Sequence, residues 1–261
     1  MHILLTNDDS HMSPLFRFAI DILKTLGVVT IVVPNEEQSW TGKSMSRFQP
    51  LTASRVQLHN DMAHGVNGTP ADCVNIGIHH LCEQRPDLVV SGINMGVNAG
   101  VGFFFASGTI GACLEANIAG IPAVALSQSL EPNVFQEWMQ YQRMSDGEET
   151  RLRLQTGILL ERVFQILLRR ADFLRQPVTW NVNLPSSAAA DWRIVPTVLG
   201  HTMYGSCFKA DGGQFRHAVE LLQPDPREQA DSTVVRQGQV SVTHIDIRQL
   251  AQTIVHPEHE G

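Results

Sequence analysis

The stretch His2-Ile3-Leu4-Leu5-Thr6-Asn7-Asp8-Asp9 (HILLTNDD, residues 2–9) decides the fold class. It joins a short apolar run, which predicts a buried strand, to a polar loop. Ser13-Pro14 then opens a helical pattern, because proline favours the first turn of a helix, and a second apolar run covers Val28–Val33. Strands that are apolar throughout are typical of parallel sheets with both faces covered. The N-terminus therefore predicts the strand–helix–strand unit of an α/β fold.

The alternation of strands and helices continues to about residue 185 and then stops. Residues 50–67 predict short edge strands or a hairpin. Further strands are predicted over 88–90, 121–126 and 178–184, helices over 71–81, 107–119 and 152–173, and loops over 91–102 and 131–150. Beyond Pro185 we expect loops with short strands, the best of them over 192–199, and a last strand over 239–247. We predict a core over residues 1–185 and a C-terminal extension over residues 186–261, disordered from His256.

Composition excludes several classes of protein. The chain has 261 residues, of which 43% are hydrophobic, and a formal net charge of -7, so no basic field favours a nucleic-acid duplex. No apolar run approaches the roughly 18–20 residues of a membrane span, and the N-terminus lacks the pattern of a signal peptide. No Cys-x-x-Cys pair occurs among Cys73, Cys82, Cys113 and Cys207, which disfavours a zinc ribbon. We expect a cytoplasmic protein with reduced cysteines and no membrane contact.

Two adjacent carboxylates, Asp8 and Asp9, directly follow the first predicted strand. The carboxyl ends of the strands form the ligand crevice of doubly wound sheets. Neighbouring carboxylates are costly there unless a cation or a proton neutralises one of them, and Mg²⁺ and Mn²⁺ bind through such groups. The alternative is that the pair only caps a helix N-terminus.

Three more polar segments are expected near the same crevice. The loop Ser91–Gly100 contains Asn94 and Asn98, whose side chains suit a metal or a phosphate, although asparagine and glycine also dominate ordinary turns. Ser107-Gly108-Thr109 opens a helix, and a helix start binds anions, although a plain N-cap is the commoner case. Ser39 lies in the polar loop after the second strand. Taken together, these groups favour acid–metal–phosphate chemistry.

The sequence resembles the SurE family, the survival-protein 5′-nucleotidases, in motifs that follow one another across about residues 2 to 246. The matching stretches are Ile3–Asp9 (ILLTNDD), Val33-Pro34, Glu37-Gln38-Ser39, Gly68–Cys73 (GTPADC), Pro86–Asn94 (PDLVVSGIN), Asn98, Ser107–Leu114 (SGTIGACL), Pro122–Ser127 (PAVALS), Asn181–Pro185 (NVNLP) and Gln237–Thr243.

The resemblance implies a Rossmann-like, three-layer core with a mostly parallel sheet and an irregular C-terminal extension that two subunits of a dimer exchange, sometimes within tetramers. It implies one divalent metal ion per subunit, Mg²⁺ or Mn²⁺. By position, the metal ligands would be Asp8, Asp9, Ser39 and Asn94. The phosphate would be held by Asn98, Ser107, Gly108 and Thr109, and the catalytic groups would be Asp8, Asn98, Ser107 and Thr109. Family substrates are nucleoside 5′- and 3′-monophosphates, with some activity on short polyphosphate.

Departures from the family pattern lie near this site. Ser10 stands where glycine is usual, and Pro14-Leu15 replaces Pro-Gly. The segment Gly100–Ala106 (GVGFFFA) lacks the usual acidic group and tyrosine, and it is one residue longer. Its phenylalanines, Phe103–Phe105, could form an apolar wall for a base, but we expect them to pack inward or against a partner subunit.

We therefore predict a divalent-metal-dependent phosphatase that hydrolyses nucleoside monophosphates. Asp8 is the acid that we expect to activate water or to act as the nucleophile. The alternatives are a catalytically weak nucleotide-binding protein of the same fold, suggested by the altered 100–106 segment, and a structural oligomer with a vestigial site. A homodimer is also expected.

Overall fold

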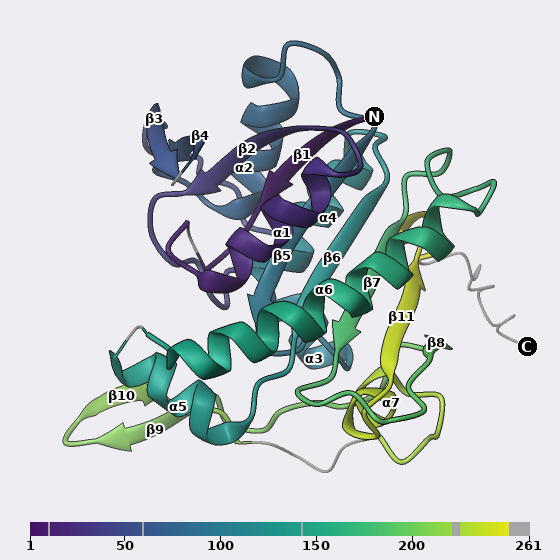
Figure 1. Ribbon diagram of the computed structural model, residues 1–261. Coiled ribbons are helices and arrows are strands. Elements are labelled where there is room, and N and C mark those ends of the chain that lie inside the picture. Colours follow the sequence, from purple (N-terminus) through teal and green to yellow (C-terminus); the bar gives the residue numbers. More distant parts are fainter. Residues whose placement is uncertain (10, 59, 142, 221–224, 251–261) are drawn as a thin grey trace, which may run out of the picture.

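A mostly parallel nine-stranded sheet forms the centre of the computed structural model, which describes residues 1–250 apart from residues 10, 59, 142 and 221–224 (Figure 1). The strands lie in the order β3-β4-β2-β1-β5-β6-β7-β11-β8. Six of the eight neighbouring pairs are parallel, and β3/β4 and β7/β11 are antiparallel. The predicted α/β class is confirmed.

The elements of the sheet and of its covering layers have the following bounds. The strands of the sheet are β1 (His2–Thr6), β2 (Val28–Pro34), β3 (Ala53–Leu58), β4 (Asp61–Val66), β5 (Leu88–Met95), β6 (Ala123–Gln128), β7 (Thr179–Leu184), β8 (Ile194–Thr197) and β11 (Val240–Ile245). The helices are α1 (Pro14–Lys24), α2 (Pro70–Ile76) with the π-helical turn η1 (Gly77–Leu81), α3 (Val101–Ala106), α4 (Gly108–Ile118), α5 (Pro132–Tyr141), α6 (Asp146–Leu168), α7 (Asp231–Arg236) and the 3₁₀ turn η2 (Ile247–Gln249). A separate hairpin consists of β9 (Phe208–Asp211) and β10 (Gln214–His217).

Helices cover both faces of the sheet, which gives three layers. Alternate residues of β1 enter different cores: Ile3 and Leu5 pack in the cluster beneath α1 and α6, whereas Leu4 packs in the cluster with α2 and α4. This alternation is the two-residue period of a strand. Figure 1 shows α1 and α6 on one face of the sheet and α2 and α4 on the other. Burial on both faces explains why β1, β5 and β6 are apolar along most of their length.

Two segments that were expected to be loops are more regular. Strand β5 runs on to Met95, past the predicted end at Val90, because it contains a bulge between Ser91 and Asn94. Gly92 within that bulge has a φ of +119°, and a Cβ there would lie 2.2 Å from the carbonyl oxygen of Leu126. Helix α3 begins inside the expected loop over 91–102 and runs on to Ala106, and helix α5 occupies 132–141 within the expected loop over 131–150. The apolar residues of α5, Val134, Phe135, Trp138 and Met139, recur at a helical spacing, so the pattern was present and the helix was missed.

The C-terminal segment adds strands to the far edge of the sheet. Strand β11 lies antiparallel to β7 and parallel to β8, so residues 240–245 return to the core. The β9–β10 hairpin extends away from the sheet, and all eight of its strand residues are exposed. Exchange of this segment between subunits stays a prediction, and the predicted disorder from His256 falls outside the described residues.

Candidate active site

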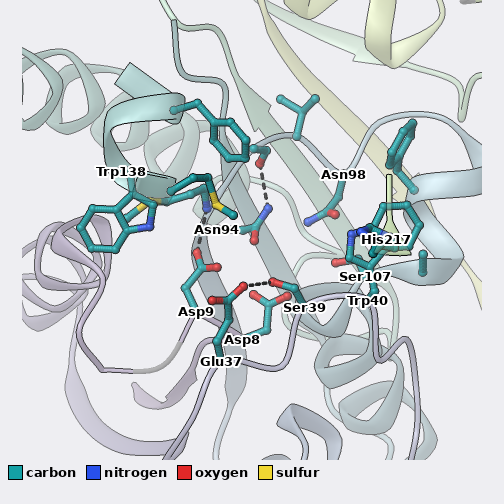
Figure 2. Close-up of a pocket in the computed structure, with 17 residues that line it drawn as sticks. Asp8, Asp9, Glu37, Ser39, Trp40, Asn94, Asn98, Ser107, Trp138 and His217 are labelled. Carbon is teal, nitrogen blue, oxygen red and sulfur yellow. Dashed lines mark hydrogen bonds between the residues drawn. The ribbon is translucent and has the colours of Figure 1, made fainter. Parts of the chain in front are cut away.

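A cavity of about 450 Å³ opens where the polypeptide leaves the carboxyl ends of β1, β2 and β5 (Figure 2). Polar groups gather in its middle, and aromatic side chains stand at both sides. This is the edge at which ligands bind in open parallel sheets. The residues that line it are Asp8, Asp9, Glu37, Ser39, Trp40, Asn94, Met95, Gly96, Val97, Asn98, Phe103, Ala106, Ser107, Phe135, Trp138, Met139 and His217.

Asp8 is the most deeply held of the acidic groups. Its side chain follows β1 directly and is 3% exposed. Thr109 donates two hydrogen bonds to it: the hydroxyl to Oδ1 at 2.7 Å and the backbone N–H to Oδ2 at 3.1 Å. Burial raises the pKa of the Asp8 carboxyl, and the two hydrogen bonds from Thr109 offset part of that rise. The start of helix α4 thus fixes the orientation of this carboxylate.

Asp9 lies beside Asp8 and faces the same cavity (Figure 2). The backbone N–H of Met95 donates to its Oδ2 at 2.9 Å, which ties the loop after β1 to the end of β5. Burial, and then the neighbouring Asp8 carboxylate, raise the pKa of Asp9 well above its usual value. Among the described residues, no lysine or arginine forms an ion pair with either carboxylate. Two neighbouring buried carboxylates are costly unless a cation or a proton neutralises one of them.

Ser39 reaches the cavity on the loop after β2. Its hydroxyl donates to Glu37 Oε1 at 2.7 Å. This loop also contacts the loop after β1, because the Gln38 N–H donates to the Asp8 carbonyl at 2.8 Å. The same loop is tied to the start of α4 because the Gly42 N–H donates to the Ala106 carbonyl at 2.9 Å. Glu37 was not predicted as a site residue, although it belongs to a motif that matches the family. It contributes a third carboxylate to the cavity.

Asn94 and Asn98 both line the cavity, but they are held differently. The Asn94 amide nitrogen donates to the Gly96 carbonyl at 2.8 Å, which leaves the side-chain oxygen as the atom available to a cation. Asn98 is 6% exposed, and its amide donates to Ser127 Oγ at 2.9 Å. Its backbone is held by two asparagines of β7, since the Asn98 N–H donates to Asn183 and Asn181 donates to the Asn98 carbonyl, each at 2.8 Å.

The segment Ser107-Gly108-Thr109 forms the start of helix α4, as predicted. Ser107 is the N-cap, accepts a hydrogen bond from the Ile110 N–H at 3.2 Å and lines the cavity. A Cβ on Gly108 would lie 3.0 Å from the Cβ of Asp8, so the helix start packs directly on that residue. Thr109 was expected at the phosphate, but its side chain is fully buried and directed to Asp8.

The donor groups fit a hard divalent cation. Asp8, Asp9, Ser39 and Asn94 all line one cavity and offer oxygen atoms, the ligand type that Mg²⁺ and Mn²⁺ prefer. In the described part of the chain, no group of three or more His, Cys, Asp and Glu side chains is arranged as a metal site. The expected set has only two carboxylates, and its remaining oxygens belong to a hydroxyl and an amide.

Aromatic side chains form one side of the cavity, contrary to the expectation for Phe103. Its ring lines the cavity and lies 5.9 Å from the ring of Trp40 and 5.6 Å from that of Tyr204. Of the other two, Phe104 is buried, as expected, and Phe105 is 56% exposed. The reason is the short helix α3, which directs successive side chains to different sides.

Sequence reasoning missed most of the aromatic side chains at this cavity. They are contributed by segments far apart in the chain: Trp40 by the loop after β2, Phe135 and Trp138 by α5, and His217 by β10. The one signal available was the position of Trp40, next to Ser39.

Within the described residues, no helix is both long and apolar enough to cross a membrane.

Comparisons with known proteins point to one family. The family model "Survival protein SurE" matches residues 3–206. The protein named 5′-nucleotidase SurE from Methanocella arvoryzae is 34% identical over 97% of this chain and 95% of its own length. The one from Methanosarcina mazei is 32% identical over 96% and 93%. The crystal structure of the SurE protein from Aquifex aeolicus is similar with a TM-score of 0.73 and 27% identity, over 95% of this chain and 94% of that one.

Proposed function

The chain belongs to the SurE family, and from that premise we propose that it is a phosphatase that hydrolyses nucleoside monophosphates to nucleoside and phosphate. The observation that carries the proposal is the pair of hydrogen bonds from Thr109 to the buried Asp8. They hold a carboxylate in a fixed orientation at the floor of a cavity that also contains Asp9, Asn98 and Ser107. The names of the relatives support this activity, 5′-nucleotidase in each case.

We further propose that the site holds one divalent cation, Mg²⁺ or Mn²⁺, through Asp8, Asp9, Ser39 and Asn94. When bound, such an ion neutralises charge on the phosphoryl oxygens and polarises the phosphorus centre. The raised pKa values of Asp8 and Asp9 support the proposal, because a cation offsets the cost of two ionised carboxylates in one buried place.

The side chains of the site have two further roles, which are the attack on phosphorus and the binding of the phosphoryl oxygens. Asp8 either takes a proton from the attacking water or attacks phosphorus itself, in which case water releases the phosphate in a second step. In both routes the bond between phosphorus and the sugar oxygen breaks, and the nucleoside leaves as an alcohol. When Asp8 acts as the base, the proton that it takes from water passes to the sugar oxygen, and when Asp8 acts as the nucleophile, the sugar oxygen takes its proton from a water molecule. The Ser107 hydroxyl, the Gly108 N–H and the second N–H of the Asn98 amide are the donors assigned to the phosphoryl oxygens. Thr109 positions Asp8.

Phosphate release from a panel of nucleoside 5′- and 3′-monophosphates tests the proposal. Each substrate is incubated with Mn²⁺, with Mg²⁺ or with EDTA, alongside an Asp8→Asn variant of confirmed fold. We expect release that EDTA stops, that added metal restores and that the variant lacks. Release that is indifferent to EDTA would overturn the metal assignment, and full activity of the variant would remove Asp8 from the mechanism.

A second candidate is a nucleotide-binding protein with little turnover. It is favoured by the segment Gly100–Ala106, which lies at the cavity without an acidic side chain and carries Phe103 instead. Equilibrium binding of a nucleoside monophosphate in the presence of metal, with no phosphate released by folded protein, would select it. Loss of both binding and release would count against both candidates.

We also propose that the chain acts in the cytoplasm as a homodimer, or as a tetramer built from dimers. The support is the β9–β10 hairpin, which extends from the sheet and exposes 56% of Phe208 and 75% of Phe215. Apolar side chains on such an arm are typical of a contact between subunits. Sedimentation at micromolar concentration tests the assembly, and a monomer there would refute it.

A further inference from the structure

Four aromatic rings form a cluster at one side of the cavity, and three of them, Trp40, Phe103 and His217, line it. Trp40 lies at the centre of this aromatic wall, with ring centroids 4.8 Å from His217, 5.3 Å from Tyr204 and 5.9 Å from Phe103. Phe103 and Tyr204 also contact each other at 5.6 Å. Figure 2 shows Trp40, His217 and Ser107 on one side of the cavity, across the acidic groups from Trp138. The wall therefore lies on the same side of the cavity as Ser107, one of the donors assigned to the phosphate.

No ring of the aromatic wall is stacked in parallel on another. Every pair meets edge to face, at 65–67° between planes. Trp40 is 39% exposed and lines the cavity. Offset parallel stacking is one of the two preferred contacts between aromatic rings, and an incoming planar ring could make it here.

The backbone of Trp40 gives an independent reason to assign it a function. Its φ of +63° is the only positive φ of a non-glycine residue in the part of the chain that the structure describes. A bulky L-residue is strained in this region, whereas glycine adopts it freely. Strained residues of this kind cluster at active sites and ligand clamps, because surrounding contacts hold them there. The contacts here are the ring contacts of the aromatic wall and the tie between Gly42 and Ala106.

We propose that Trp40, supported by Phe103, Tyr204 and His217, is the platform on which the planar base of the substrate stacks. The inference rests on the proposed function and adds the determinant that separates nucleotides from other phosphomonoesters. A nucleoside monophosphate has a charged end and a planar end on either side of its ribose. The cavity offers hydrogen-bond donors at Ser107 and aromatic rings on the same side, in the matching order. Stacking is tolerant of base identity, so we assign the class of ligand and no single base.

The test compares adenosine 5′-monophosphate with ribose 5-phosphate, which has the same sugar and phosphate but no base. Three variants are measured beside the unaltered protein. Trp40→Gly removes the ring and suits a positive φ, Trp40→Phe keeps a ring, and Trp138→Leu removes the indole on the opposite side of the cavity. Both kcat/KM and equilibrium binding are determined, so the base platform is tested even if phosphate release is undetectable. Thermal melting confirms that each variant is folded.

The unaltered protein should prefer the nucleotide, and Trp40→Gly should reduce that preference about 10-fold, the effect of losing one base–aromatic stack. Trp40→Phe should keep most of the preference for the nucleotide, and Trp138→Leu should keep all of it. An equal loss for both ligands in Trp40→Gly would show that Trp40 only supports the loop of Ser39, and would overturn the inference. Loss of the preference in Trp138→Leu instead would place the base on the other side, and no preference in the unaltered protein would overturn the inference as well.

Discussion

Asp8 and Thr109, 101 positions apart in the sequence, are joined by two hydrogen bonds that use both oxygens of one carboxylate. One donor is the Thr109 hydroxyl and the other its backbone N–H at the start of α4. The positive end of the helix dipole and the two donors stabilise the ionised form of a carboxyl whose burial disfavours it. The connection also ties the end of β1 to the helix start that carries Ser107.

Replacing Asp8 by asparagine should abolish turnover without unfolding the protein. The amide keeps an oxygen that can accept from Thr109, so we expect a melting temperature close to that of the unaltered chain. It cannot take a proton or attack phosphorus, so phosphate release should fall at least about 100-fold. Phosphate assay and thermal melting on the same preparation check both expectations. Activity within a factor of two would contradict the role given to Asp8.

Replacing Thr109 by valine should lower kcat more than it changes KM. Valine has nearly the same shape, and the backbone N–H remains, so only the 2.7 Å bond to Asp8 is lost. A lost buried hydrogen bond costs about 1–3 kcal/mol when the remaining partner is left unsatisfied, and here the carboxylate keeps one donor. We expect kcat to fall about 10-fold, the equivalent of 1.4 kcal/mol. A variant with unchanged kcat and a raised KM would instead place Thr109 at the phosphate.

The fold could be predicted where short-range patterns decide it. The apolar runs of β1 and β2 and the proline that opens α1 are local signals, and each of these elements appears where the pattern indicated. The segment over 91–106 could not be predicted in this way, because its glycines and asparagines are typical of loops. Its regular structure depends on pairing with β6 across a bulge, which is a non-local contact.

The candidate site was predictable in its members and less so in its contacts. Asp8, Asp9 and Asn94 could be placed at one edge because parallel strands bring their carboxyl ends together. The direction of the Thr109 side chain depends on the distance between a helix and a strand, which residue spacing does not give. Apart from Phe103, the aromatic wall was missed for a similar reason: Tyr204 and His217 reach Trp40 only through the path of the C-terminal segment.

Replacing Gly111 by alanine should disturb the loop that carries Ser39 and Trp40. A Cβ on Gly111 would lie 2.2 Å from the carbonyl oxygen of Gly42 and 2.9 Å from the Cα of Lys43, so the backbone of the loop would have to move. Overpacking of this kind costs about 1–3 kcal/mol, which exceeds the gain in helix propensity from alanine. For each kcal/mol of stability lost, the melting temperature should fall by roughly 2–4 °C. Phosphate release should also be reduced.

Gly157→Ala is the matched control for this prediction. Gly157 lies inside helix α6, and a Cβ there would meet nothing within 4 Å. The same substitution should therefore stabilise the protein by about 0.5–1 kcal/mol through helix propensity and leave turnover unchanged. Equal effects of the two substitutions would mean that the close approach of Gly111 and Gly42 is unimportant.

Asp225 should make the protein lose stability in acid. Its carboxylate accepts hydrogen bonds from Arg227 Nε at 3.0 Å and from the His201 N–H at 2.7 Å. The hydrogen bonds from the Arg227 side chain, followed by the backbone N–H of His201, hold the pKa of Asp225 well below its usual value. A group whose pKa is lower in the folded state stabilises the protein above its unfolded pKa of about 3.9, and this contribution disappears as the pH falls toward the folded value.

Asp225→Asn isolates that contribution, because every other acidic group is common to both proteins. Unfolding by urea at pH 7, 5, 4 and 3 should show the variant less stable than the unaltered chain at pH 7 and 5. The difference in stability should shrink below about pH 4, because the unfolded chain then takes up a proton at Asp225 and the ionised carboxylate contributes less to stability. Arg227→Gln should give the same pattern, since it removes the main cause of the lowered pKa. A difference that stays constant from pH 7 to pH 3 would show that the pair stabilises the C-terminal segment through packing, without any contribution from charge.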